Sequence, residues 1–169
     1  RSPITFDYAV AHDCNIMCWP FSMPFAEAEK YKSQLDEAIT KAGGTWSGSF
    51  ALMRHTAVYE TEDDRNAAMA AIRNVLGKFG NVMTKTGDVR NGFADNVPAE
   101  ELEGNVRVEP KMLEENLMFG SPDTVIEKLR TYEALGVDAF IYYASMGLEM
   151  DVQKRSLQSF IDHVMPEFT

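Results

Sequence analysis

The sequence predicts an α/β fold of parallel strands, of the kind that forms part of a (β/α)8 TIM barrel. Apolar strand-like segments alternate with amphipathic helical segments, and glycines close several of them. Strand–helix–strand units of this kind place successive strands parallel. A complete barrel needs about 250 residues, and this chain has 169. A doubly wound sheet is the competing architecture, but no strand is followed by the Gly-rich turn that binds dinucleotides.

The first half of the chain alternates helical and strand-like segments. Proline suits the first turn of a helix, and Pro3 and Pro24 both precede helical composition. The run around Met17 is apolar throughout, as in a strand buried on both faces, whereas Thr61 has the pattern of a helix N-cap. The expected elements are helices over residues 2–12, 25–42 and 61–80 and strands over residues 15–19 and 49–59.

Residues 81–116 interrupt this regularity. Five Gly and Pro residues break any period there, which predicts a long irregular insertion with a short helix near residues 98–103. Irregular stretches of this length in a compact domain are often functional, for example as a lid. We therefore expect this insertion to be the least ordered region of the chain.

Regular elements return after the insertion. A short apolar strand at residues 117–119 meets a helix that begins at Ser121 and ends at Gly136. Residues 137–144 form the clearest strand of the chain, because four large apolar or aromatic residues follow one another there. An amphipathic helix then closes the sequence and is expected to end before Pro166.

The charge and cysteine content exclude several classes of protein. The net charge is −10, and an acidic surface repels nucleic acid and anionic lipid headgroups, so we expect neither as a partner. No apolar run approaches the ~18 residues that span a bilayer, so no transmembrane segment is expected. Cys14 and Cys18 are too few for a disulfide framework and are expected to be reduced, buried packing residues of a cytoplasmic protein.

Two turns share the pattern Ser-Pro-x-Thr at the start of a helix. Such a turn presents free N–H groups and two hydroxyls at the positive end of the helix dipole, which suits a phosphate. In the first turn, Ser2 and Thr5 lie one helical turn apart, with Arg1 beside them, so we predict a phosphate site there. The second turn, at Ser121, contains Asp123, which would repel an anion, and we interpret it as ordinary capping.

No nucleophile–base pair and no metal-spaced cluster stands out, so no metal is expected and the catalytic residues are unassigned. The histidines, at positions 12, 55 and 163, are scattered among different elements. Large apolar residues gather near predicted strand ends, where barrel enzymes carry their chemistry. Core packing is the simpler interpretation for most of them, but Met17, Trp19 and Phe21 would suit a flat ring or an apolar substrate.

The sequence resembles the bacterial-luciferase-like flavin-dependent monooxygenases over nearly all of its length. The resemblance is strongest in the stretch MFGSPDTVIEKL at residues 118–129, followed by LGVD at residues 135–138. The closing helix around residues 156–166 and the opening at residues 2–9 are also similar to the family.

This resemblance implies that residues 15–19, 49–59 and 137–144 are strands six, seven and eight of the TIM barrel. The chain would then be one partial domain over residues 1–169, with the insertion as a mobile loop over the active site. Strands one to five and most of a homo-oligomer interface would lie upstream. The resemblance also implies that Ser2 and Thr5 contact the flavin phosphate.

The implied activity is oxidation of a small organic substrate with O2 and reduced FMN, either bound or supplied by a flavin reductase. The cofactor would carry the oxygen chemistry, which explains why no catalytic triad is found. The chain alone is expected to be inactive. Two alternatives remain: a deazaflavin-dependent oxidoreductase of the same fold, and a non-catalytic half-barrel module for ligand binding or assembly.

Overall fold

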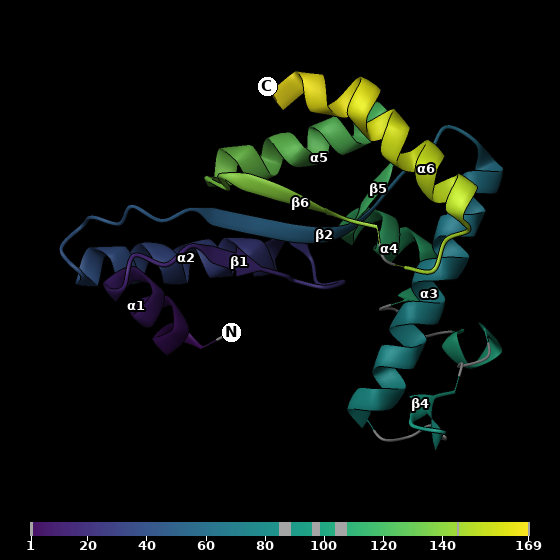
Figure 1. Cartoon of the computed structure of the whole chain (residues 1–169), viewed down its shortest axis with the longest axis horizontal. Coiled ribbons are helices and arrows are strands. Elements are labelled where there is room, and N and C mark those ends of the chain that lie inside the picture. The colour runs from purple at the N-terminus through teal and green to yellow at the C-terminus, as the bar shows by residue number, and fades with distance from the viewer. Residues whose placement is uncertain (1, 85–88, 96–98, 104–107, 145, 169) are drawn as a thin grey trace.

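A computed structural model describes residues 2–84, 89–95, 99–103, 108–144 and 146–168 (Figure 1). Strand β2 (Phe50–Val58) lies at its centre and pairs with three other strands, each parallel to it. The partners are β1 (Ile16–Cys18), β5 (Met118–Gly120) and β6 (Ala139–Tyr143). This parallel pairing confirms the predicted α/β class and the predicted order of strands.

Helices connect the strands in the predicted order. They are α1 (Pro3–Ala11), α2 (Phe25–Lys41), α3 (Glu62–Thr84), α4 (Pro110–Asn116), α5 (Pro122–Leu135) and α6 (Met150–Ser159). The Thr61 side chain caps α3, since its Oγ1 accepts from the Asp64 N–H at 3.2 Å. Gly136 ends α5 with a φ of 88°, a left-handed cap that glycine adopts without strain.

Two helix ends differ from the prediction. Helix α3 continues through Gly80 to Thr84, because one helical glycine costs only about 1 kcal/mol relative to alanine. The last helix also continues past Pro166, as a π turn (η3, Phe160–Val164) and a 3-10 turn (η4, Met165–Phe168). Pro166 stands at the start of the 3-10 turn, where a helix tolerates a residue without an N–H group.

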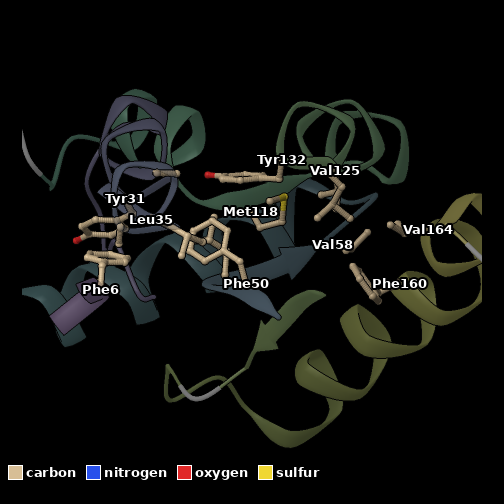
Figure 2. Close-up of a cluster of buried hydrophobic side chains, with 14 of the residues drawn as sticks. Phe6, Tyr31, Leu35, Phe50, Val58, Met118, Val125, Tyr132, Phe160 and Val164 are labelled. Atoms are coloured by element: carbon tan, nitrogen blue, oxygen red, sulfur yellow. The ribbon is translucent and has the colours of Figure 1, made fainter. Parts of the chain in front are cut away.

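One face of the sheet carries the main hydrophobic core. Phe50, Leu52 and Val58 of β2 are buried on this face. Figure 2 shows the side chains that meet them from the surrounding helices, which include Phe6, Tyr31, Leu35, Val125, Tyr132, Phe160 and Val164. Phe140 of β6 packs against the same cluster. The helices therefore cover the sheet on the side to which the even-numbered residues of β2 point.

The opposite face of the sheet is open along β1, the first half of β2 and the adjoining part of β6. Met17 is 54% exposed and Ile141 38% exposed, and strand alternation places Ala51 and Met53 on this face with them. The prediction of a strand buried on both faces at residues 15–19 is therefore wrong. The only pairing partner of β1 among the described strands is β2, and helices cover just one of its faces. An uncovered apolar face is what an incomplete barrel presents.

The cysteines also differ from the prediction. Cys14 is exposed and Cys18 is half-buried, and both are free thiols. Burial raises the pKa of the Cys18 thiol to about 11, so it stays protonated at neutral pH. The prediction of buried cysteines failed because Cys14 precedes β1 and Cys18 ends it, at the edge of the sheet rather than inside it.

The segment predicted as an irregular insertion contains more structure than expected. A short antiparallel hairpin joins β3 (Val89–Arg90) to β4 (Phe93–Ala94), and a 3-10 turn, η1, covers Ala99–Leu102. Both lie beside α3, away from the sheet (Figure 1). Leu102 and Val108 pack with Leu113 of α4 in a second buried cluster. Positions 98 and 104, at the two sides of the predicted short helix, fall outside the described residues.

We expect the β3–β4 hairpin to exchange its amide hydrogens much faster than β6. Two residue pairs form the whole hairpin, and Val89 and Phe93 are 69% and 77% exposed, so little buried area opposes local opening. Hydrogen–deuterium exchange followed by mass spectrometry gives both rates in one experiment. Equal protection of residues 89–95 and 139–143 would contradict a mobile loop.

Candidate functional site

The carboxyl ends of three parallel strands and helix α3 bring together an aromatic cluster of five residues: Trp19, Phe21, His55, Phe79 and Tyr143. Trp19 follows β1, His55 lies in β2, and Tyr143 ends β6 in register with His55. The His55 and Tyr143 rings stack with centroids 4.5 Å apart, and Trp19 meets them edge-on at 5.7 and 5.5 Å. Phe21 lies 4.9 Å from Trp19 and 4.7 Å from Phe79. Barrel enzymes carry their chemistry at such strand ends.

His55 is the most buried polar group of this cluster. It is 1% exposed, and neither of its ring nitrogens has a hydrogen-bond partner among the described residues. Burial lowers its pKa to about 4, so the imidazole is neutral at pH 7. A neutral imidazole offers one N–H donor and one acceptor nitrogen. Leaving such groups unpaired in the interior costs about 1–3 kcal/mol each, so a functional explanation is warranted.

Arg54 precedes His55 in β2 and therefore points to the opposite face of the strand. It is fully buried, and burial lowers its pKa below the ordinary value. Its Nη1 donates to the carbonyls of Phe21 and Met23 at 3.0 and 2.7 Å, and its Nε donates to the Tyr132 hydroxyl at 3.0 Å. Arg54 thus ties the loop after β1 to the outer side of the sheet.

The loop held by Arg54 presents Phe21 to the aromatic cluster. Phe21 has a φ of 58°, a left-handed conformation that is rare for a bulky side chain. Such a backbone costs on the order of 1–3 kcal/mol and persists where surrounding contacts fix it. Those contacts are present: Arg54 binds the Phe21 carbonyl, and the Asn116 side chain donates to the Ser22 carbonyl at 3.1 Å.

A cavity of about 210 Å³ lies between the start of α1 and the edge strand. Its lining includes Thr5, Met17 and Trp19. The structure therefore brings one predicted phosphate ligand and two predicted ring-pocket residues to the same cavity. Phe21 is not in this lining but packs against Trp19.

The two Ser-Pro-x-Thr turns differ in their hydrogen bonds. The Ser2 side chain makes no capping hydrogen bond, and the first turn is closed by the Thr5 N–H and the Ser2 carbonyl at 2.9 Å. The Ser121 Oγ instead accepts from the Thr124 N–H at 3.3 Å, which confirms the capping interpretation of that turn. Ser2 and Thr5 are both exposed, and position 1, the predicted third ligand, lies outside the described residues.

Sequence reasoning did not assign Arg54, His55 or Tyr143 to the site. The only signal for the first two was a charged–polar pair inside an otherwise apolar strand. Tyr143 could not be singled out because it belongs to a run of large residues that begins at Phe140. Alternate side chains of this run point to the core and to the open face. Only the pairing register shows that His55 and Tyr143 are neighbours.

Two kinds of site are absent from the part of the chain that the structure describes. No group of three or more His, Cys, Asp or Glu side chains there is arranged to hold a metal ion. None of the helices in these same ranges is both long enough and apolar enough to span a bilayer.

The chain is similar to a protein of known activity. A scan against models of protein families finds no match. The chain is 27% identical over 169 residues to the oxygenase component of the flavin-dependent trigonelline monooxygenase of Acinetobacter baylyi. The match covers 100% of this chain and 47% of the relative, so the chain spans about half the relative's length. The resemblance to flavin-dependent monooxygenases noted in the sequence is thereby confirmed.

Two solved structures share the fold. The monooxygenase RslO1 from Streptomyces bottropensis matches with a TM-score of 0.71 and 14% identity, over 99% of this chain and 46% of that one. An F420-dependent secondary alcohol dehydrogenase, solved with an F420-acetone adduct, matches with a TM-score of 0.58 and 17% identity, over 96% and 46%. Both matches confirm that this open parallel sheet corresponds to part of a larger fold of the luciferase-like barrel type.

Proposed function

We propose that this chain is part of a flavin-dependent monooxygenase that uses reduced FMN and O2 to oxidise a small organic substrate. The aromatic cluster at the carboxyl ends of the parallel strands carries the proposal, because it forms an apolar wall where barrel enzymes bind cofactor and substrate. The trigonelline monooxygenase supports it, since that relative is flavin-dependent and matches the whole of this chain. Because the relative is an oxygenase component, a separate flavin reductase is the proposed source of reduced flavin.

The residues present fit a flavin. Met17 and Trp19 offer apolar surface to a flat ring in the cavity that Thr5 also lines. The Trp19 Nε1 is buried without a partner among the described residues, so it would pair with a polar atom at the edge of the ring. The hydroxyls of Ser2 and Thr5 stand at the start of α1, where the helix dipole favours a phosphate.

The side chains of this chain would bind and orient the flavin and shield it from water. They would not transfer protons. When bound, reduced flavin supplies the electrons that activate O2. Ser2 and Thr5 would hold the phosphate, Met17 and Trp19 would support the ring, and the aromatic cluster would exclude water from the reacting groups. The neutral state of His55 agrees with these roles, because binding the flavin and excluding water require no charged acid or base at the cluster.

A deazaflavin-dependent oxidoreductase is the alternative, and the fold match to the F420-dependent dehydrogenase favours it. Parallel absorption titrations of the protein with FMN and with F420 separate the two. We expect the tighter binding for FMN. Tighter binding of F420 would favour the deazaflavin enzyme, and binding of neither would favour a non-catalytic half-barrel module.

Replacing both Ser2 and Thr5 with alanine is expected to weaken FMN binding by about 1–3 kcal/mol, the net worth of one or two hydrogen bonds. The free energy of unfolding without flavin should change little, because the Ser2 side chain makes no cap. Flavin titration and urea unfolding of the variant measure the two effects.

The matched control is the double replacement of Ser121 and Thr124 with alanine. It should lower stability by about 1 kcal/mol, since Ser121 caps α5, and leave FMN affinity nearly unchanged. Loss of FMN by this control and not by the Ser2/Thr5 variant would show that the phosphate site lies at the other turn.

A further inference from the structure

The loop after β1 is supported by a helix of the predicted insertion as well as by β2. Arg54 of β2 donates to the carbonyls of Phe21 and Met23. The carbonyl between them, that of Ser22, accepts from the Asn116 Nδ2 at 3.1 Å. Asn116 is the last residue of α4, which ends the segment predicted as an insertion. Side chains from two separate elements therefore hold three successive carbonyls of this loop.

Helix α4 is fixed at its carboxyl end by a half-buried ammonium group. Lys128 of α5 donates to the Leu117 and Phe119 carbonyls, each at 2.8 Å. It also donates to the carbonyl of Glu114, so each of the three N–H groups of the ammonium has an acceptor. Burial lowers the pKa of Lys128 to about 8, and the group stays mostly protonated at pH 7. The carboxyl end of α4, which carries Asn116, is thus held by α5.

The Glu114 side chain ties α4 to two further parts of the fold. Its Oε1 accepts from the Tyr59 hydroxyl at 3.1 Å and from the Arg65 Nε at 2.5 Å. Tyr59 follows β2, and Arg65 lies in α3. Leu113, one residue before Glu114, is fully buried in the second cluster. These contacts fix α4 in place, unlike the exposed β3–β4 hairpin of the same segment.

A packing contact also connects the insertion to the ring pocket. The Phe21 side chain packs against the second buried cluster, to which the insertion contributes Leu102 and Val108. The same ring meets Trp19 edge-on, with the centroids 4.9 Å apart. Trp19 lines the cavity proposed for the flavin ring, whereas Asn116 does not. A displacement of the loop would therefore move the ring against which Trp19 rests, with no change to any other residue of the cavity.

We propose that Asn116 is a positioning residue for the flavin site. Its amide holds the Ser22 carbonyl, and this contact sets the place of Phe21 and of the Trp19 indole that would support the flavin ring. Asn116 acts only through the loop, because it does not line the cavity. The inference rests on the proposed function and gives the end of the insertion a second role, as a support of the flavin site.

The test replaces Asn116 with aspartate, which keeps the shape of the side chain but has no N–H donor for the Ser22 carbonyl. Titration with FMN, followed by flavin absorption, measures the effect. Affinity should fall about fivefold, which corresponds to the net worth of one hydrogen bond. The matched control is Asn66→Asp, which makes the same change of charge at an exposed position of α3 and should bind FMN as the parent does. If Asn116→Asp does not fold, Asn116→Ala adds no charge and takes its place.

The fluorescence of Trp19 in the flavin-free protein gives a second readout. The chain has two tryptophans, so Trp46→Phe leaves Trp19 as the sole reporter. In this background, Asn116→Asp should shift the emission to longer wavelength, because a loosened loop admits water to the indole, and Asn66→Asp should not. Unchanged FMN affinity or unchanged Trp19 emission in Asn116→Asp overturns the assignment. A parent chain that binds no FMN refutes the proposed function, and the emission of Trp19 then still decides whether Asn116 positions the indole.

Discussion

Replacing Arg54 with methionine is expected to lower the free energy of unfolding by about 3 kcal/mol or more. The change removes three hydrogen bonds of 3.0 Å or less, to the Phe21 and Met23 carbonyls and to the Tyr132 hydroxyl. Bonds from a charged donor are worth about 1.5–3 kcal/mol each, and the change leaves the Phe21 and Met23 carbonyls without this donor. Relief from burying the guanidinium offsets part of this loss. Urea unfolding followed by circular dichroism measures the difference.

Arg54→Met should also loosen the loop that follows β1. Amide exchange and proteolysis should increase at residues 19–24, because the left-handed conformation of Phe21 loses its main support. Arg90→Met is the matched control: Arg90 is 81% exposed and pairs with Asp95 on the surface, so the expected loss is below about 1 kcal/mol. A similar small loss for Arg54→Met would show that the loop after β1 is held by other contacts.

Acidification from pH 7 to pH 5 is expected to remove about 2 kcal/mol of stability through His55 alone. Its pKa is lowered from 6.5 to about 4 by burial, so the unfolded chain takes up a proton in this window and the folded chain does not. The unfolded state then binds more protons, and stability falls as the pH falls. The contribution of His55 is fully present above pH 6.5 and is lost progressively down to about pH 4.

A His55→Phe variant isolates this contribution. The variant has no imidazole at position 55, so its stability should depend less on pH between 7 and 5 than that of the parent. His163→Phe, at an exposed position, serves as the matched control for replacing a histidine by phenylalanine. Equal slopes for the parent and His55→Phe would mean that His55 is solvated or charged in the folded protein.

The fold class could be predicted from the sequence because each element carries a local signal. The run from Phe50 to Val58 is long and apolar, Ser121 caps its helix, and Gly136 ends it. The predicted end of a helix was wrong where packing along the whole helix outweighed a local stop signal. Gly80 does not stop α3, since packing of the remaining turns compensates for one weak position.

The site was less predictable because it depends on contacts between distant residues. Trp19 and Phe21 were selected as ring-pocket residues, but their neighbours His55 and Tyr143 come from strands much later in the chain. Met17 was assigned to the same pocket, and its 54% exposure depends on β1 being an edge strand, which no local pattern reveals. The hydrogen bonds from Arg54 to the loop likewise require the folded backbone.

The central place of β2 in the sheet has a consequence for synthesis on the ribosome. Its neighbour β1 emerges before it, but β5 and β6 follow only after α3 and α4 have been translated. At roughly 5–20 residues per second, the edge of β2 that pairs with β6 stays open for several seconds. Unpaired strand edges that stay exposed for so long are prone to misassembly. The interval ends when Tyr143 leaves the tunnel and can pair beside His55.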